Sequence, residues 1–78
     1  MKNITIDAVG TTASIDTALE NLIADPNTRI KKFDFWGDGP YDHEVTIHCE
    51  VSDHIAEKLE NDGVNTLSSG ILGCVYNA

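Results

Sequence analysis

The residues of this sequence whose types could do chemistry are three histidines, two cysteines and thirteen carboxylates. Nucleophilic catalysis needs a serine or cysteine beside a histidine that acts as its base. Cys49 directly follows His48 in an alternating run, so their side chains should point to opposite faces of a strand and cannot form such a pair. Cys74 is expected in the core. No arrangement meets the requirements of a catalytic site, and we expect a non-enzymatic protein without a cofactor.

Metal binding is the main chemical alternative. Asp7, His48 and Glu50 are expected side by side on one face of a sheet, and carboxylate and imidazole suit divalent first-row metals. Such a site would make the protein a metal-binding domain or a metal-dependent enzyme. The sequence contains no recognised ligand motif, so a solvated polar face is the expected role of these residues.

A stretch rich in aromatic and acidic residues, from Phe33 to Glu44, joins the two strongest strand candidates. Its Gly-Asp-Gly-Pro segment predicts a hairpin loop longer than two residues. The spacing of its carboxylates does not follow the calcium-binding EF-hand loop. Tryptophan and tyrosine dominate the energetic centres of protein interfaces, and surrounding carboxylates favour a basic partner. We therefore predict a protein-contact site that includes Asp34, Trp36, Asp38, Tyr41, Asp42 and Glu44.

The charge balance narrows the choice of partner. Thirteen acidic residues against five basic ones give the 78-residue chain a net charge of −8. Direct binding of nucleic acid depends on lysine and arginine that displace counterions from phosphates, so it is not expected here. A basic protein surface is the better candidate, because opposite fields speed and orient the encounter.

The chain is short enough for one domain, residues 1–78, with a modest core. Alternating apolar residues predict strands over 3–9, 29–36 and 43–51, and a final strand over 71–76 in which Gly73 suggests close backbone approach or a bulge. A first helix follows Gly10, with Ser14 or Thr12 as N-cap, and ends before Pro26. Its buried face should consist of Ile15, Ala18, Leu19, Leu22 and Ile23. Ser52-Asp53 begins a second helix that stops at Asp62-Gly63.

The order strand, helix, strand, strand, helix, strand predicts an α+β, ferredoxin-like fold, in which two helices cover one face of a four-stranded antiparallel sheet. The first and third strands should lie in the middle. Phe33 and Phe35 should share one face of the second strand with Lys31, and Ile30, Lys32, Asp34 and Trp36 the other. The open face would then add Asp7 and Glu50 to the contact site. The outer face of the second helix, with Asp53, Glu57, Glu60 and Asp62, is a rival acidic surface.

In size, charge and architecture the whole chain resembles the small acidic anti-CRISPR proteins of phages and mobile elements. The resemblance implies an inhibitor that acts as a DNA mimic, with carboxylates where phosphates would sit on a nucleic-acid-handling protein or CRISPR effector complex. Physically, carboxylates on the hairpin and open face would meet lysine and arginine that otherwise pair with phosphate. No family motif is shared, so no family residue is assigned.

Cys49 and Cys74 make no metal-binding spacing and are expected to be reduced, buried thiols of a cytoplasmic protein. No signal peptide and no long apolar run is present, so no membrane association is expected. A structural module that dimerises through the open face or an edge strand is the remaining alternative.

Overall fold

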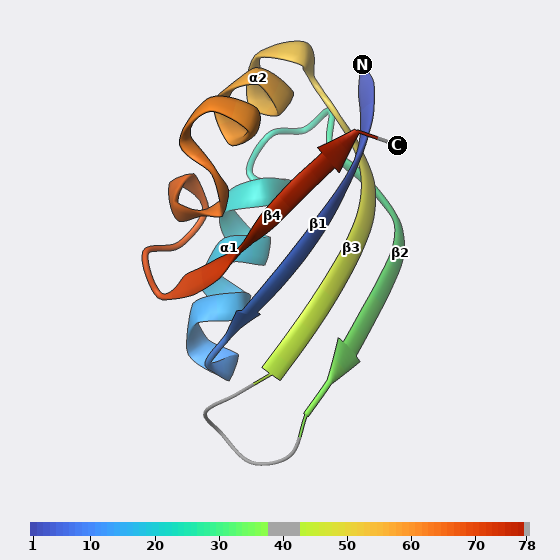
Figure 1. Ribbon diagram of the computed structural model, residues 1–78. Helices are drawn as coiled ribbons and strands as arrows, with labels where there is room; N and C mark the ends of the chain where they lie inside the picture. The colour runs from blue at the N-terminus through green and yellow to red at the C-terminus, as the bar shows by residue number, and fades with distance from the viewer. Residues whose placement is uncertain (38–42, 78) are drawn as a thin grey trace.

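The computed structural model describes residues 1–37 and 43–77 (Figure 1). Within these residues the four strands form a single antiparallel sheet. The elements, in chain order, are β1 (Lys2–Gly10), α1 (Thr12–Ile23), β2 (Arg29–Trp36), β3 (His43–Val51), α2 (Asp53–Asp62), the 3-10 helix η1 (Val64–Thr66) and β4 (Ile71–Asn77). The predicted α+β class, with four antiparallel strands and two helices, is confirmed.

The strands are arranged in the order β2-β3-β1-β4, so the first and third strands occupy the middle as predicted. In register, Ile4 lies opposite Cys49, and Ile6 opposite Ile47. These four side chains are almost fully buried, because alternate residues of a strand share a face and both helices cover this one (Figure 1). The opposite face of the sheet carries no helix and is called the open face below.

The N-cap residue of α1 lies one position before the earlier of the two predicted caps. Thr11 is the N-cap: its backbone is extended, and its hydroxyl accepts a hydrogen bond of 3.1 Å from the Ser14 amide. The expectation of Thr12 or Ser14 was wrong because β1 ends at Gly10, so the chain has already turned at Thr11. The helix ends at Ile23, with Ala24 as C-cap, before Pro26 as predicted.

The buried stripe of α1 is narrower than its periodicity predicts. Ile15, Ala18 and Leu22 are buried and Leu19 partly so, but Ile23 is 55% exposed. Ile23 is the last helical residue and lies about 100° around the axis from Leu22, outside the stripe that faces the sheet. The predicted burial of Ile23 was therefore wrong.

Strand β2 protrudes beyond the cover of the helices. Both helices pack chiefly on β1 and β4, at the other side of the sheet (Figure 1). Phe33 and Phe35 pair with Ile47 and Val45 and so face the helix side, yet they remain 41% and 42% exposed. The Phe35 ring stacks on buried His43, with the ring centroids 4.7 Å apart. The two phenylalanines thus border the core without being enclosed by it.

A register shift between Ile30 and Lys32 changes the predicted faces of β2. Ile30 pairs with Cys49 on the helix side, Lys32 pairs with His48 on the open face, and Lys31 is the extra residue. The prediction that Ile30 shares a face with Lys32 was wrong, because unbroken alternation cannot show a bulge.

Helix α2 and the return to β4 complete the core. Ser52 occupies the N-cap position and Gly63 ends the helix with φ of 78°, both as predicted. The connection after it buries Val64 in η1 and Leu67 directly after η1. A Cβ on Gly73 would overlap the Asp7 carbonyl oxygen, so the predicted close backbone approach is confirmed.

Candidate functional site

The open face is an ordered grid, because residues opposite one another in antiparallel strands share a face. Reading across the sheet in the order β4, β1, β3, β2, three rows of side chains follow from the registers. From the end nearest the β2–β3 connection, they are Leu72–Val9–Glu44–Trp36, then Cys74–Asp7–Thr46–Asp34, then Tyr76–Thr5–His48–Lys32. A shorter row at the far end contains Asn3, Glu50 and Arg29.

The first row is largely apolar although it faces solvent. Leu72 is 75% exposed, Trp36 53% and Val9 41%. Glu44 stands between Val9 and Trp36 in this row. Singly exposed apolar side chains are ordinary, but three in one row with one aromatic form a patch of the kind that protein partners cover.

Carboxylates border this apolar row. Asp7 and Asp34 occupy the second row on either side of Thr46, whose hydroxyl donates a hydrogen bond of 3.3 Å to Asp7 Oδ1. Among the described residues, these first two rows contain no lysine and no arginine. We call their exposed apolar and acidic side chains the loop-end patch: Asp7, Val9, Asp34, Trp36, Glu44 and Leu72.

Positive charge gathers at the opposite end of the same face. Arg29 lies opposite Glu50, and Lys31 Nζ donates a hydrogen bond of 2.7 Å to Asn3 Oδ1 across the sheet. His48 Nδ1 lies 3.0 Å from the Thr5 hydroxyl oxygen. The open face is therefore uneven in charge. Three of its carboxylates, Asp7, Asp34 and Glu44, lie in the two rows next to the β2–β3 connection, whereas Glu50 lies at the far end with the basic residues. Lys32, in the third row, lies 3.7 Å from Asp34 Oδ2.

The structure brings together part of the predicted contact site. Asp7, Asp34, Trp36 and Glu44 share the loop-end patch, as expected from their alternation. Glu50 shares the face but lies at the basic end, opposite Arg29, because register separates it from Asp7 by two rows. The other predicted members, Asp38, Tyr41 and Asp42, lie outside the described residues.

Two members of the patch were missed from the sequence. Val9 lies on the same face of β1 as Asp7 and is 41% exposed, but a single exposed valine in a strand does not by itself indicate a binding site. Leu72 joins the patch only because β4 pairs with β1 in the register that places it beside Val9. These two residues could not be found because alternation within one strand does not determine the register in which that strand pairs with its neighbours.

The residues of the metal alternative do not converge. The three proposed ligands lie in three different rows. Asp7 is in the second row, His48 is in the third row opposite Thr5, and Glu50 is in the last row opposite Asn3. Within residues 1–37 and 43–77, no group of three or more histidine, cysteine, aspartate or glutamate side chains is placed to hold a metal ion.

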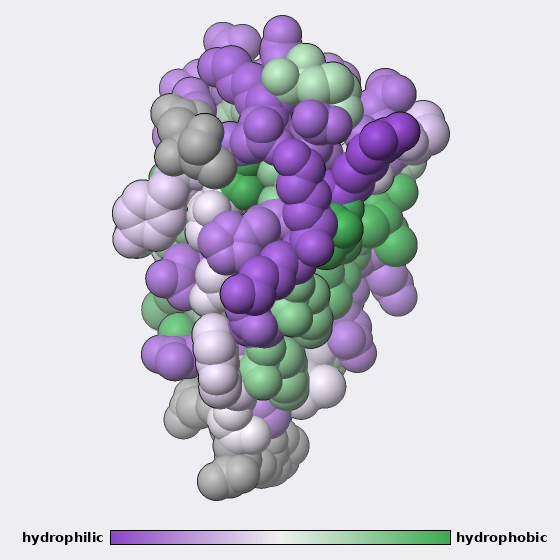
Figure 2. All heavy atoms as spheres, turned by 90° about the vertical axis from the view of Figure 1, so that its right-hand side faces the viewer, coloured by the Kyte–Doolittle hydropathy of each residue, from purple (hydrophilic) through white to green (hydrophobic). Residues whose placement is uncertain are grey.

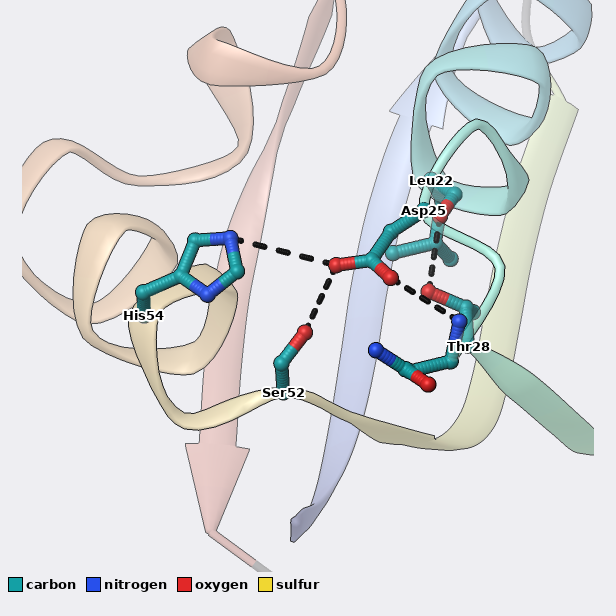
Figure 3. Close-up of polar contacts among 6 residues, drawn as sticks. Leu22, Asp25, Thr28, Ser52 and His54 are labelled. Atoms are coloured by element: carbon teal, nitrogen blue, oxygen red, sulfur yellow. Dashed lines mark hydrogen bonds and ion pairs between the residues drawn. The ribbon is translucent and has the colours of Figure 1, made fainter.

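A serine, a histidine and an aspartate do meet elsewhere, between the end of α1 and the start of α2 (Figure 3). The Ser52 hydroxyl donates a hydrogen bond of 2.6 Å to Asp25 Oδ2, and His54 Nε2 lies 3.8 Å from that same oxygen. A catalytic triad needs the histidine between the other two groups, whereas here the carboxylate stands in the middle. The cluster therefore offers no activated nucleophile.

This cluster joins two segments instead. Asp25 Oδ1 accepts a hydrogen bond from the Asn27 amide, and the Thr28 hydroxyl donates to the Leu22 carbonyl, both at 2.9 Å (Figure 3). The hydrogen bond from Ser52, followed by that from Asn27 and the nearby His54, lowers the pKa of Asp25 from its ordinary value of 3.8. The contacts close the turn after α1 and attach it to α2.

The two cysteines differ in environment. Cys49 is buried, and burial raises the pKa of its thiol to about 11. Cys74 is exposed on the open face beside Asp7, so the prediction that it lies in the core was wrong. In β4, Gly73 pairs with Ala8 on the helix side and Cys74 pairs with Asp7, so Cys74 lies on the open face.

The helices carry the second acidic surface. Exposed positions of α1 and α2 hold six carboxylates and one lysine: Asp16, Glu20, Asp53, Glu57, Glu60, Asp62 and Lys58. No exposed aromatic residue accompanies them on these two helices. Ile23, at the end of α1, is the exposed large apolar residue of these two helices. This surface therefore resembles the loop-end patch in its acidic charge but has no exposed tryptophan.

These features define a small α+β domain with one helix-covered face and one open face that is uneven in charge. No protein-family model matches the chain, and neither the curated proteins nor the solved structures contain a match to it. Among the described residues, no helix has the length and apolar character needed to span a membrane.

Proposed function

We propose that this protein is a non-enzymatic inhibitor that binds a basic, nucleic-acid-handling partner through the loop-end patch. The observation that carries the proposal is the combination of Asp7, Asp34 and Glu44 with exposed Trp36, without a lysine or arginine in the same rows. Carboxylates choose basic partners, and an exposed tryptophan supplies the buried anchor that such interfaces need.

The mode of inhibition follows from the charge. Lysine and arginine that hold phosphates form equally short hydrogen bonds with carboxylates. A domain that places several carboxylates on such a surface competes with nucleic acid for it. The resemblance to small acidic anti-CRISPR proteins makes a CRISPR effector complex the first partner to test. The two unpaired cysteines support action in the cytoplasm, where thiols stay reduced.

The same proposal includes the ferredoxin-like assignment of the fold. The element order and the central position of β1 and β3 support it. This arrangement leaves one sheet face without helices, and that face holds the loop-end patch.

The test is affinity capture with the tagged protein from a bacterial lysate at low salt. We expect a basic nucleic-acid-binding protein or complex that salt releases, because exposed charge pairs are screened. Added DNA or RNA should compete with the captured partner. Recovery of no basic or nucleic-acid-binding protein, or of one that nucleic acid does not displace, would contradict the proposal.

A further inference from the structure

Strand β2 combines two features that are rarely left uncovered in a monomer. It is an edge strand, with no described strand beyond it. Its helix-side face exposes Ile30 at 38%, Phe33 at 41% and Phe35 at 42%. We call these three residues the β2 apolar strip. In Figure 2, which looks at the β2 side of the molecule, hydrophobic side chains form a band beside the polar ones.

Native proteins commonly protect an exposed edge with lysines, but both lysines of β2 make side-chain contacts within the chain. Arg29 lies opposite Glu50, and Lys31 reaches across the open face to Asn3 at 2.7 Å. Lys32 Nζ lies 3.7 Å from Asp34 Oδ2 of its own strand. Lysine repulsion along the edge is therefore reduced, and one acidic and one basic side chain flank Phe33.

That flanking pair makes the strand complementary to itself. If two copies of β2 run antiparallel about a two-fold axis through Phe33, Lys32 of each copy stands opposite Asp34 of the other. The axis thus forms two opposite-charge pairs on the open face and brings the two Phe33 side chains together on the helix side. Cross-strand pairs of opposite charge and of aromatic residues both stabilise antiparallel pairing.

The neighbouring registers lack this match. An axis through Asp34 sets two carboxylates opposite each other, and an axis through Lys32 sets two ammonium groups opposite each other. Like charges directly opposite are destabilising. We propose that a second copy of this chain covers the β2 apolar strip, by antiparallel β2–β2 pairing centred on Phe33.

This inference does not rest on the proposed inhibitor function. Pairing continues the sheet across two copies, and the helix-side phenylalanines form one shared apolar contact. A small domain buries a limited fraction of its surface, so burial of this strip adds stability that the single copy lacks. The open faces of the two copies become one longer surface.

The experiment is analytical ultracentrifugation of the full chain over a range of protein concentrations, with circular dichroism to verify folding. We expect a reversible monomer–dimer equilibrium for the natural sequence. Asp34→Lys leaves only lysines beside Phe33, and Lys32→Asp leaves only aspartates. Each variant should raise the dimer dissociation constant about tenfold, since both opposite-charge pairs become like-charge pairs. Glu60→Lys on α2 is the control and should leave the equilibrium unchanged.

Two complementation measurements fix the register. An equimolar mixture of Asp34→Lys and Lys32→Asp should form a mixed dimer that is tighter than either variant alone. The double exchange, Lys32→Asp with Asp34→Lys, should restore the dimer. A monomer at every concentration would contradict the proposal, and so would a dimer that neither single variant weakens. A dimer whose single variants weaken it without complementation would also overturn the proposed register.

Discussion

Asp25 and Ser52 connect the two helical segments: the Ser52 hydroxyl donates a hydrogen bond of 2.6 Å to Asp25 Oδ2. Ser52 is the N-cap residue of α2, and its side chain makes no capping bond to that helix. The Ser52 hydroxyl therefore does not cap its own helix, and its hydrogen bond instead joins the start of α2 to the turn after α1.

The lowered pKa of Asp25 predicts an acid-sensitive contact. A carboxyl group whose pKa is lower in the folded state stabilises the fold above its unfolded value of 3.8, and this contribution is lost as the pH falls through the folded value. At pH values below 3.8, the urea concentration at the midpoint of unfolding should therefore decrease. Asp25→Asn should lose this part of the pH dependence.

Ser52→Ala removes the hydrogen bond that contributes most to the lowered pKa of Asp25. The variant should therefore be less stable than the natural sequence at neutral pH, and this difference in stability should become smaller as the pH falls below 3.8. His54→Ala is the control, because His54 is the weakest contributor and is 75% exposed. An identical pH profile for Ser52→Ala and the natural sequence would contradict this assignment.

Leu22 and Ile23 are adjacent in sequence but should differ sharply in energetic role. Leu22 is 1% exposed and Ile23 is 55% exposed. Leu22→Ala should lower the free energy of unfolding by about 3 kcal/mol through lost burial and a cavity. Ile23→Ala should change it by no more than about 0.5 kcal/mol, as for other surface positions. Equal losses in urea denaturation would show that the stripe of α1 is wider than described.

These two residues also show how far the sequence predicts the fold. Periodicity identified α1, and the alternation from Val45 to Val51 identified a strand with one buried face. Both are properties of one segment. Whether Ile23, Phe33 or Cys74 is covered depends on where the helices sit on the sheet, and that placement is set by contacts between distant segments.

The candidate site was likewise predictable where it depends on one segment, and not where it depends on contacts between segments. The alternation of β1 and β3 predicted that Asp7, Glu44 and Glu50 would share a face. It did not predict that Glu50 stands two rows away from Asp7, or that Leu72 stands beside Val9, since both depend on pairing register. The bulge at Lys31 likewise leaves no signature in the pattern of apolar residues.

The two thiols should react at very different rates. Cys74 is exposed, whereas Cys49 is 1% exposed with its pKa raised to about 11. Because the thiolate is the reactive form, Cys49 should react about a hundredfold more slowly near pH 8 with a disulfide reagent in the folded protein. Cys74→Ala should remove the fast phase. Two fast thiols in the folded protein would contradict the burial of Cys49.

Trp36 should contribute to binding and little to folding. Trp36→Ala should weaken the captured complex at least about tenfold, as expected for an aromatic anchor. Its free energy of unfolding should change by no more than about 0.5 kcal/mol, because the side chain is 53% exposed. Tyr76→Ala is the matched control, with 54% exposure on the same face but outside the loop-end patch. Equal effects of the two variants on binding would argue against the patch.

The most direct measurement compares partner binding at low salt by two double variants with the same change in charge. Asp7→Lys with Glu44→Lys reverses the loop-end patch, and Glu57→Lys with Glu60→Lys reverses the outer face of α2. If the patch is the binding site, the first variant should lose more than about tenfold in affinity, while the second stays within about threefold. Loss of binding by the α2 variant, with the patch variant unaffected, would contradict the account and place the interface on the helices.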